Sequence, residues 1–293
     1  MPAEVLATLA LGPGQFAVDA TVGAGGHAAL LLSAVAPGGR LLCLDVDPAA
    51  LEAAGARLGP LAARERVQLD LVRSNFRELP AVLGQRAPGQ APQAVLADLG
   101  VSSMQLDRPE RGFSFRHDAP LDLRMDPLLP RTGADLLREL SERELADLLY
   151  HLSDERGARR IARWIVQARE RGEAITTTEQ LARLVLRALK VRGHARVHPA
   201  TRTFQALRMA VNQELQALEV FLEAAPESLV PGGVLAVISF HSGEDRLVKH
   251  RFKALAATGR FQLVRKSVLR PEPAEQSRNP RSRSARLRAL RRM

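Results

Sequence analysis

Three glycines follow an apolar run near the amino terminus, in the stretch Phe16-Ala-Val-Asp-Ala-Thr-Val-Gly-Ala-Gly-Gly-His27. An apolar run that breaks into glycines and then into an Ala/Leu-rich segment, residues 28–35, predicts a buried strand, a tight turn and a helix start. Glycines let the backbone approach a ligand closely, and the N–H groups that open the helix point at any anionic group there. The stretch therefore predicts a nucleotide-binding loop, although ordinary strand-to-helix turns also use glycines.

A carboxylate stands where such a loop would need one. Residues 40–44 predict a second strand, which ends at Asp45. An acidic residue about 20 residues past the glycines holds ribose hydroxyls in a doubly wound sheet. A nicotinamide dinucleotide and S-adenosylmethionine (SAM) both fit this pattern. Dinucleotide sites prefer G-x-G-x-x-G directly after the strand, whereas the Asp-x-x-x-Gly-x-Gly form that begins at Asp19 is similar to the first motif of SAM-dependent methyltransferases, so we favour SAM.

Two later strands also end at candidate site residues. The strand predicted at residues 66–72 precedes Phe76, whose ring either stacks on an adenine or packs in the core. The strand predicted at residues 93–97 precedes Asp98, and ligands of open α/β sheets bind outside the carboxyl ends of the strands. We therefore expect Asp98 at the reactive end of the cofactor, where it either accepts a proton from the substrate or holds the methionine amino group.

More than a hundred residues separate Asp98 from the next buried strand, residues 234–240. A crossover between parallel strands needs only a few tens of residues, so the sequence predicts an inserted domain. Its content is helical, because the capping boxes Ser141-Glu-Arg-Glu144 and Thr177-Thr-Glu-Gln180 each open an apolar segment. We expect a discontinuous sheet domain, residues 1–104 and 201–293, around an all-helical domain of residues 105–200.

Three amphipathic or basic segments complete the prediction. Residues 203–225 predict one long crossover helix that returns the chain to the fifth strand. Residues 278–293 hold seven arginines and no acid, which indicates either a disordered tail or a hairpin strand that contacts RNA. A helical segment between the two capping boxes has an apolar face, expected in the core, and an arginine face that is either solvated or follows phosphates. The two faces comprise Ile161, Trp164, Ile165 and Ala168, and Arg156, Arg159 and Arg163.

Composition limits the function classes. Lys and Arg exceed Asp and Glu by 42 to 32 in a chain of 293 residues, which favours a polyanionic partner. The single cysteine, Cys43, excludes an internal disulfide and leaves too little thiolate for a zinc site, so we expect no metal. The sequence shows neither a basic leader with an apolar stretch nor an apolar run of about 18 residues, so a cytoplasmic protein without a membrane partner is expected.

Six stretches of the chain together resemble the signature blocks of the bacterial MraW/RsmH family. They are Asp19-Ala-Thr-Val-Gly-Ala-Gly-Gly-His27, Asp98-Leu-Gly-Val-Ser-Ser103 with Gln105-Leu-Asp107, Arg111-Gly-Phe-Ser-Phe115, Pro120-Leu-Asp-Leu-Arg-Met-Asp126, His198-Pro-Ala-Thr-Arg-Thr-Phe204 and Ile238-Ser-Phe-His-Ser-Gly-Glu-Asp-Arg246. The likeness extends over nearly the whole chain, in order. One departure is Gly243, which replaces the leucine usual in the last block and would loosen that loop.

The resemblance implies a fold, a cofactor and a reaction. Members of that family are SAM-dependent methyltransferases that modify N4 of a cytidine in the decoding region of 16S rRNA. The implied fold is α/β, a doubly wound Rossmann-like class I SAM-dependent methyltransferase sheet with an inserted all-helical domain for substrate recognition. The implied partner is 16S rRNA within the 30S subunit, and a homodimer stays open.

The resemblance also implies site residues. The cofactor-binding residues would be Gly25, Gly26, His27, Asp45, Phe76, Asp98 and Gln105. Apart from the resemblance, the catalytic candidates are Asp98, placed by topology, and His198 and His241. Arg202, Glu244 and Asp245 are further target-side residues, expected to contact base or phosphate. Two alternatives to rRNA methylation stay open: a methyltransferase of a small molecule or protein, and a non-catalytic SAM-binding ribosome assembly factor.

Overall fold

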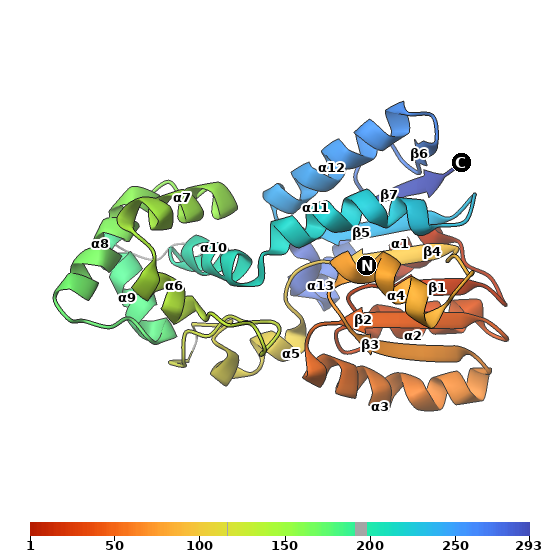
Figure 1. Cartoon of the computed structure of the whole chain (residues 1–293), viewed down its shortest axis with the longest axis horizontal. Coiled ribbons are helices and arrows are strands. Elements are labelled where there is room, and N and C mark those ends of the chain that lie inside the picture. Colours follow the sequence, from red (N-terminus) through yellow and green to blue (C-terminus); the bar gives the residue numbers. More distant parts are fainter. Residues whose placement is uncertain (116, 191–197) are drawn as a thin grey trace. The chain divides into compact units, whose positions relative to one another are not determined.

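The computed structural model describes residues 1–115, 117–190 and 198–293, and the chain divides into two compact units (Figure 1). The first unit joins Met1–Gly100 to Leu215–Met293, and the second is Val101–Glu214. Residues 101–104, expected in the sheet domain, belong instead to the second unit, and so do residues 201–214. For residues 201–214 the reason is that Phe204, Leu207 and Val211 of helix α10 (Thr201–Asn212) are buried in the core of the helical unit.

The single long helix expected over residues 203–225 is wrong. Helix α10 ends at Asn212, and a separate helix, α11 (Glu214–Ala224), follows. Gln213 between them adopts a left-handed conformation with φ 52°, and its N–H donates to the carbonyls of Met209 and Ala210. Gln213 is thus a helix C-cap without glycine. Because no glycine marks the end of α10 and the amphipathic period continues into α11, the sequence pattern does not indicate the break.

The first unit is built on a sheet of seven strands in the order β3-β2-β1-β4-β5-β7-β6. The strands are β1 (Phe16–Asp19), β2 (Arg40–Asp45), β3 (Gln68–Arg73), β4 (Ala94–Asp98), β5 (Val234–Ser239), β6 (Phe261–Leu263) and β7 (Arg286–Arg292). Strands β1 to β5 pair in parallel, whereas β7 is antiparallel to both β5 and β6. The strand order reverses at β1, which lies between β2 and β4, so the topological switch point is there.

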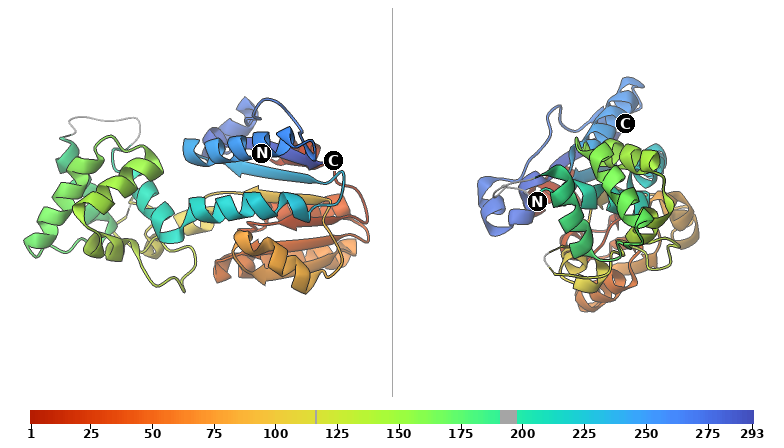
Figure 2. Two further views of the ribbon diagram at one scale, coloured as in Figure 1. Left: turned by 45° about the horizontal axis from the view of Figure 1, so that its top comes forward. Right: turned by 90° about the vertical axis from the view of Figure 1, so that its left-hand side faces the viewer.

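Helices cover both faces of this sheet (Figures 1 and 2). Alternate residues of each strand point to opposite faces, so Ala17 of β1 packs in one apolar cluster and Val18 in the other. One face carries α1 (Pro2–Leu9), α2 (Gly26–Val35) and α3 (Pro48–Glu65), and the other carries α4 (Leu79–Arg86), α11 and α12 (Ser242–Ala257). The expected doubly wound α/β class is confirmed.

The arginine-rich end of the chain is part of the sheet. A short helix, α13 (Pro273–Arg278), precedes β7, which lies between β5 and β6. Leu287 and Leu290 are buried, and the guanidinium of Arg288 donates to both carboxylate oxygens of Asp245 in α12 at 2.7 and 3.3 Å. The disordered-tail alternative is therefore wrong for Arg286–Arg292.

The second unit is helical, and in Figure 2 its helices run from yellow through green to teal. They are α5 (Ser103–Leu106), α6 (Gly133–Glu139), α7 (Glu142–Ser153), α8 (Ala158–Glu170), α9 (Thr178–Leu189) and α10. Both predicted capping boxes are confirmed, at Ser141 with Glu144 and at Thr177 with Gln180. Among the described residues, no helix is both long and apolar enough to cross a bilayer.

Candidate active site

Three carboxylates end the strands at the switch point. Asp19 ends β1, Asp45 ends β2 and Asp98 ends β4, and β1 pairs in parallel with both neighbours. The carboxyl ends of parallel neighbours meet at one edge of a sheet, so the three side chains gather where open α/β sheets bind their ligands. Two of them belong to the predicted site, and Asp19 is an addition.

The glycine loop after β1 forms the cradle of this site. Gly25 is the N-cap of α2 with φ 77°, and a Cβ there would lie 3.3 Å from Cγ of Leu58. Both the conformation and the close approach therefore require glycine. A Cβ on Gly26 would meet nothing within 4 Å, and the first turn of α2 contains no acidic residue. The opening N–H groups of α2 are thus suited to an anionic group of a ligand.

Asp45 is held rigidly by backbone donors. Its Oδ2 accepts the N–H of Gly23 at 2.9 Å, and its Oδ1 accepts the N–H of Asp47 at 2.9 Å. Burial raises the pKa of Asp45, and these backbone hydrogen bonds partly offset that rise. Each carboxylate oxygen still has a lone pair, so the fixed group can accept two ribose hydroxyls.

Phe76 follows β3 at the start of the short 3-10 helix η1 (Phe76–Glu78). Its half-buried ring meets Phe221 of α11 edge to face, with the ring centroids 5.3 Å apart and an interplanar angle of 88°. Such an edge-to-face pair is a favourable aromatic geometry. Core packing therefore accounts for one contact of the ring, and stacking on an adenine stays a prediction.

His27 and Asp98 form an ion pair across the loop. Nδ1 of His27 lies 3.1 Å from Oδ2 of Asp98, and the backbone N–H of Asp98 donates to Oγ1 of Thr21 at 2.7 Å. Burial alone would lower the pKa of His27, but the hydrogen bond and charge of Asp98, helped by Asp19, outweigh it and raise that pKa.

The second oxygen of Asp98 is the most informative atom of the site. Oδ1 is buried, and among the described residues no group donates a hydrogen bond to it. A buried carboxylate oxygen without a donor costs free energy, and such groups in native proteins call for an explanation. A donor supplied by a ligand, such as an amine, would satisfy it.

Asp19 is the site residue that the sequence reasoning missed. It is 1% exposed, and its carboxylate accepts the N–H of Thr21 at 3.1 Å. Burial raises the pKa of Asp19 to about 7, although the nearby His27 opposes the rise. Asp19 and His27 therefore each favour the charged form of the other. The available signal was an acidic residue at the end of an otherwise apolar central strand.

His241 begins α12 and caps it. Its Nδ1 accepts the N–H of Glu244 at 3.3 Å, and Oε2 of the buried Glu244 accepts the N–H of Phe240 at 2.9 Å. This capping box closes the first turn although Gly243 stands within it, so the loop that was expected to be loosened is a regular helix start. A Cβ on Gly243 would lie 3.2 Å from Nδ1 of His241.

The three remaining predicted site residues lie in the helical unit. Arg202 is exposed in α10, and its guanidinium donates to the carbonyl of Asp154 at 3.2 Å. The other two are Gln105 and His198. Gln105 is buried in α5, and its Oε1 accepts the N–H of Ser102 at 3.0 Å. His198 precedes α10, and its Nδ1 accepts the N–H of Ala200 at 3.2 Å. The His198 ring also packs on Phe115, with centroids 4.6 Å apart. Both side chains are thus fixed by contacts within their own unit.

Comparison with known proteins decides the family. The sequence model of the MraW methylase family matches residues 1–293. The chain belongs to the MraW methylase family. One relative, from Cyanothece sp., is 51% identical over 99% of this chain and 92% of its own length, and another, from Syntrophobacter fumaroxidans, is 45% identical over 98% and 93%. Both relatives are named ribosomal RNA small subunit methyltransferase H.

The resemblance to the MraW/RsmH family is therefore confirmed, and the methylase uses SAM as its cofactor. The residues present fit that group. Gly25 and the start of α2 leave room for an anionic carboxylate, and Asp45 is fixed for ribose hydroxyls.

Proposed function

We propose that this methylase transfers the methyl group of SAM to the exocyclic N4 of a single cytidine in the decoding region of small-subunit rRNA. Its family and the names of its relatives support a small-subunit rRNA substrate. The resemblance of six sequence blocks to the MraW/RsmH family supports N4 of a cytidine as the methylated atom. The single observation that carries the chemistry is the buried, unpartnered Oδ1 of Asp98 at the carboxyl end of β4.

The proposed role of Asp98 follows from the chemistry of the amine. The N4 amine of cytosine is a poor nucleophile because its lone pair is delocalised into the ring. A carboxylate oxygen that accepts an N4–H bond localises that lone pair and takes the proton as the new N–C bond forms. His27 would hold the other oxygen of Asp98, so that Oδ1 keeps one orientation.

The cofactor-binding roles divide among the loop and the strand ends. When bound, SAM supplies a methyl group made electrophilic by its sulfonium. Gly25, Gly26 and His27 would surround the methionine end, Asp45 the ribose and Phe76 the adenine. The family resemblance adds Gln105 as a further cofactor-binding residue. These residues place the methyl group for an in-line reaction and help to exclude water.

Both target-side histidines are fixed in the same way. In His198 and His241, Nδ1 accepts a backbone N–H, so the neutral ring carries its proton on Nε2. The Nε2–H of His198 could therefore donate to a base carbonyl or to a phosphate oxygen. In His241, Nε2 is buried and lies 3.1 Å from Oε1 of Glu244, so this ring positions the start of α12 rather than contacting the base. We assign recognition of the rRNA, met in the cytoplasm within the 30S subunit, to His198 and to the helical unit.

Methyl transfer from labelled SAM to 30S subunits that lack this modification tests the proposal. Mass spectrometry of the digested rRNA should show N4-methylated cytidine at one decoding-region site, and fully modified 30S subunits should accept no label. Label on another base or atom would contradict the proposal. Activity on a free small molecule that is insensitive to salt would favour a small-molecule enzyme, and tight 30S binding without turnover would favour an assembly factor.

A further inference from the structure

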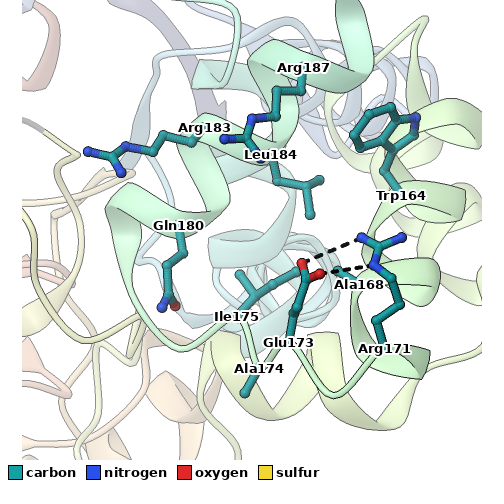
Figure 3. A pocket seen from close by; sticks show the side chains of 10 residues that line it. All are labelled: Trp164, Ala168, Arg171, Glu173, Ala174, Ile175, Gln180, Arg183, Leu184 and Arg187. Atoms are coloured by element: carbon teal, nitrogen blue, oxygen red, sulfur yellow. Dashed lines mark hydrogen bonds and ion pairs between the residues drawn. The ribbon is translucent and has the colours of Figure 1, made fainter.

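The helical unit contains a hollow of about 220 Å³ between α8 and α9, apart from every site residue discussed above (Figure 3). Its lining combines one large aromatic ring with several cations. The residues are Trp164, Ala168, Arg171, Glu173, Ala174, Ile175, Gln180, Arg183, Leu184 and Arg187. A small recess with this lining is suited to a ligand that combines a flat ring with a separate negative charge.

Trp164 departs from its apolar stripe. Ile161, Ile165 and Ala168 share its face of α8 and are buried, at 3% exposure or less. Trp164 itself is half-buried and lines the hollow, so the expectation of a purely core role is incomplete. A partly exposed tryptophan ring offers a platform on which a nucleic-acid base can stack.

The charge of the lining is positive, with three arginines against one glutamate. Arg171 donates to both oxygens of Glu173 at 2.9 and 3.4 Å, and Arg183 pairs with Glu179. In Figure 3, Arg183 extends away from Trp164. Hydrogen bonds from Arg171, and more weakly the charge of Arg187, hold the pKa of Glu173 below its usual range.

Arg187 is the arginine available to a ligand. No carboxylate among the described residues forms an ion pair with it, although it lies close enough to Glu173 to affect that group. A guanidinium without a carboxylate partner and a tryptophan ring line the same hollow, and together they match the phosphate and the base of a nucleotide.

We propose that this hollow binds one unpaired nucleotide of the rRNA substrate, with its base on Trp164 and its phosphate on Arg187. This inference rests on the proposed function, because the rRNA supplies the nucleotide. The nucleotide must be unpaired, since a base inside a helix is stacked on its neighbours and cannot reach an aromatic side chain. The hollow would thus hold a nucleotide other than the target, while the chemistry takes place at Asp98.

The chain provides its own probe, because Trp164 is its only tryptophan. The full chain would be titrated with a single-stranded RNA of decoding-region sequence, and separately with inorganic polyphosphate, while tryptophan fluorescence is recorded. Stacking of a base should quench the fluorescence in a saturable way, whereas polyphosphate should leave it nearly unchanged. RNA binding, followed independently by anisotropy of a labelled RNA, should coincide with the quenching.

Variants separate the ring from the charge. Trp164→Leu should weaken RNA binding about tenfold in the anisotropy assay, because stacking on an aromatic side chain contributes about 1–3 kcal/mol per base. Trp164→Phe should recover part of the loss, and Arg187→Ala should weaken binding about fivefold while quenching at saturation persists. Arg143→Ala is the matched control, since Arg143 is 92% exposed in the same unit and outside the lining.

Several results would overturn the inference. These are RNA binding without quenching, equal losses for Arg187→Ala and Arg143→Ala, or an acidic peptide that quenches Trp164 and displaces the RNA. Methyl transfer to 30S subunits is measured in parallel to separate the two proposals. Active methylation without quenching removes only the nucleotide site, whereas saturable quenching without methylation removes only the proposed function.

Discussion

In the sheet unit, Asp19 and Asp45 lie at the ends of buried strands, and burial raises the pKa of both carboxyls. In the helical unit, Asp135, Glu144 and Glu173 lie near or at the surface, and their pKa values are lowered instead. The backbone of Thr132 donates to Asp135, the hydroxyl of Ser141 to Glu144 and the guanidinium of Arg171 to Glu173.

The contrast separates two kinds of binding. Buried charges with fixed partners are screened little by salt and are oriented before a ligand arrives, which suits a small cofactor and a proton transfer. Exposed charges are solvated and screened within about 10 Å at moderate ionic strength, which suits a polyanion that makes many weak contacts. Variants in the sheet unit should therefore act through chemistry, cofactor affinity and pH, and variants in the helical unit through salt-dependent RNA binding.

The largest effect is expected from Asp98→Asn. The amide cannot accept the N4 proton, so the methyl-transfer rate should fall about 10²- to 10⁴-fold, the usual contribution of a positioned general base. Single-turnover rates would measure this fall, and calorimetry would measure SAM affinity in the same variant.

Asp70→Asn is the control for Asp98→Asn, because Asp70 is a carboxylate of β3 that pairs with Arg40. If SAM affinity falls as far as the rate, Asp98 holds the methionine amino group instead. An unchanged rate would remove Asp98 from the chemistry altogether.

Asp45→Ala should weaken SAM binding about 10- to 100-fold. The loss corresponds to about 1.5–3 kcal/mol, the contribution of one charge-assisted hydrogen bond. Isothermal calorimetry would measure the affinity, with Glu52→Gln as an exposed carboxylate control in α3. Equal affinity for Asp45→Ala and the wild type would show that Asp45 does not hold the ribose.

Asp19→Asn tests the buried group through pH. The folded pKa of Asp19 is about 7 against an ordinary value of 3.8, so between these values only the folded state keeps the proton. Stability therefore falls as pH rises through this window, and the raised pKa of His27 acts in the same direction at its upper end. Asp19→Asn should reduce the difference in the free energy of unfolding between pH 5 and pH 7 by on the order of 2 kcal/mol.

Urea unfolding followed by circular dichroism would measure this difference. Glu144→Gln is the matched control, because its lowered pKa contributes stability that is lost only as pH falls below about 4.5. The Glu144 variant should therefore keep the wild-type slope between pH 5 and pH 7. Parallel slopes for wild type and Asp19→Asn would mean that Asp19 is ionised throughout this range.

The sheet unit was predictable where the signals are local. An apolar run that ends in glycines or in a carboxylate marks a buried strand and its ligand-facing end, which is how Asp45 and Asp98 could be placed. The capping boxes at Ser141 and Thr177 are also local, since each needs only four consecutive residues.

What the sequence could not show depends on pairing across the fold. The ion pair of His27 with Asp98 joins residues from different elements. His27 contacts Oδ2 of Asp98, and Oδ1 is left without a hydrogen-bond donor. Strand β7 pairs with β5, which is distant in the sequence, and the basic composition of β7 does not indicate this partner. Gln213 is a residue type that seldom adopts the left-handed conformation, so the break between α10 and α11 had no local signal.

The smallest effect is expected from Arg156, Arg159 and Arg163, which are exposed in or just before α8. The salt dependence of RNA binding is the slope of the log binding constant against the log salt concentration. If the three arginines contact phosphates, changing all three to alanine should reduce the magnitude of this slope by up to about 2–3, since each phosphate contact contributes about 0.7–0.9. The change should stay near the lower figure, because Arg163 already lies 3.5 Å from Glu142.

The control for these arginines is a triple variant of Arg131, Arg138 and Arg143, exposed arginines of the same unit that each lie within 4 Å of a carboxylate. It removes the same formal charge, but that charge is already compensated locally. Filter binding of 30S rRNA from low to moderate salt would compare the two triples. If both leave the slope unaltered, the arginines near α8 are only a solvated face. If both triple variants reduce the slope equally, the net charge of the protein governs RNA binding, and Arg156, Arg159 and Arg163 form no specific phosphate contacts.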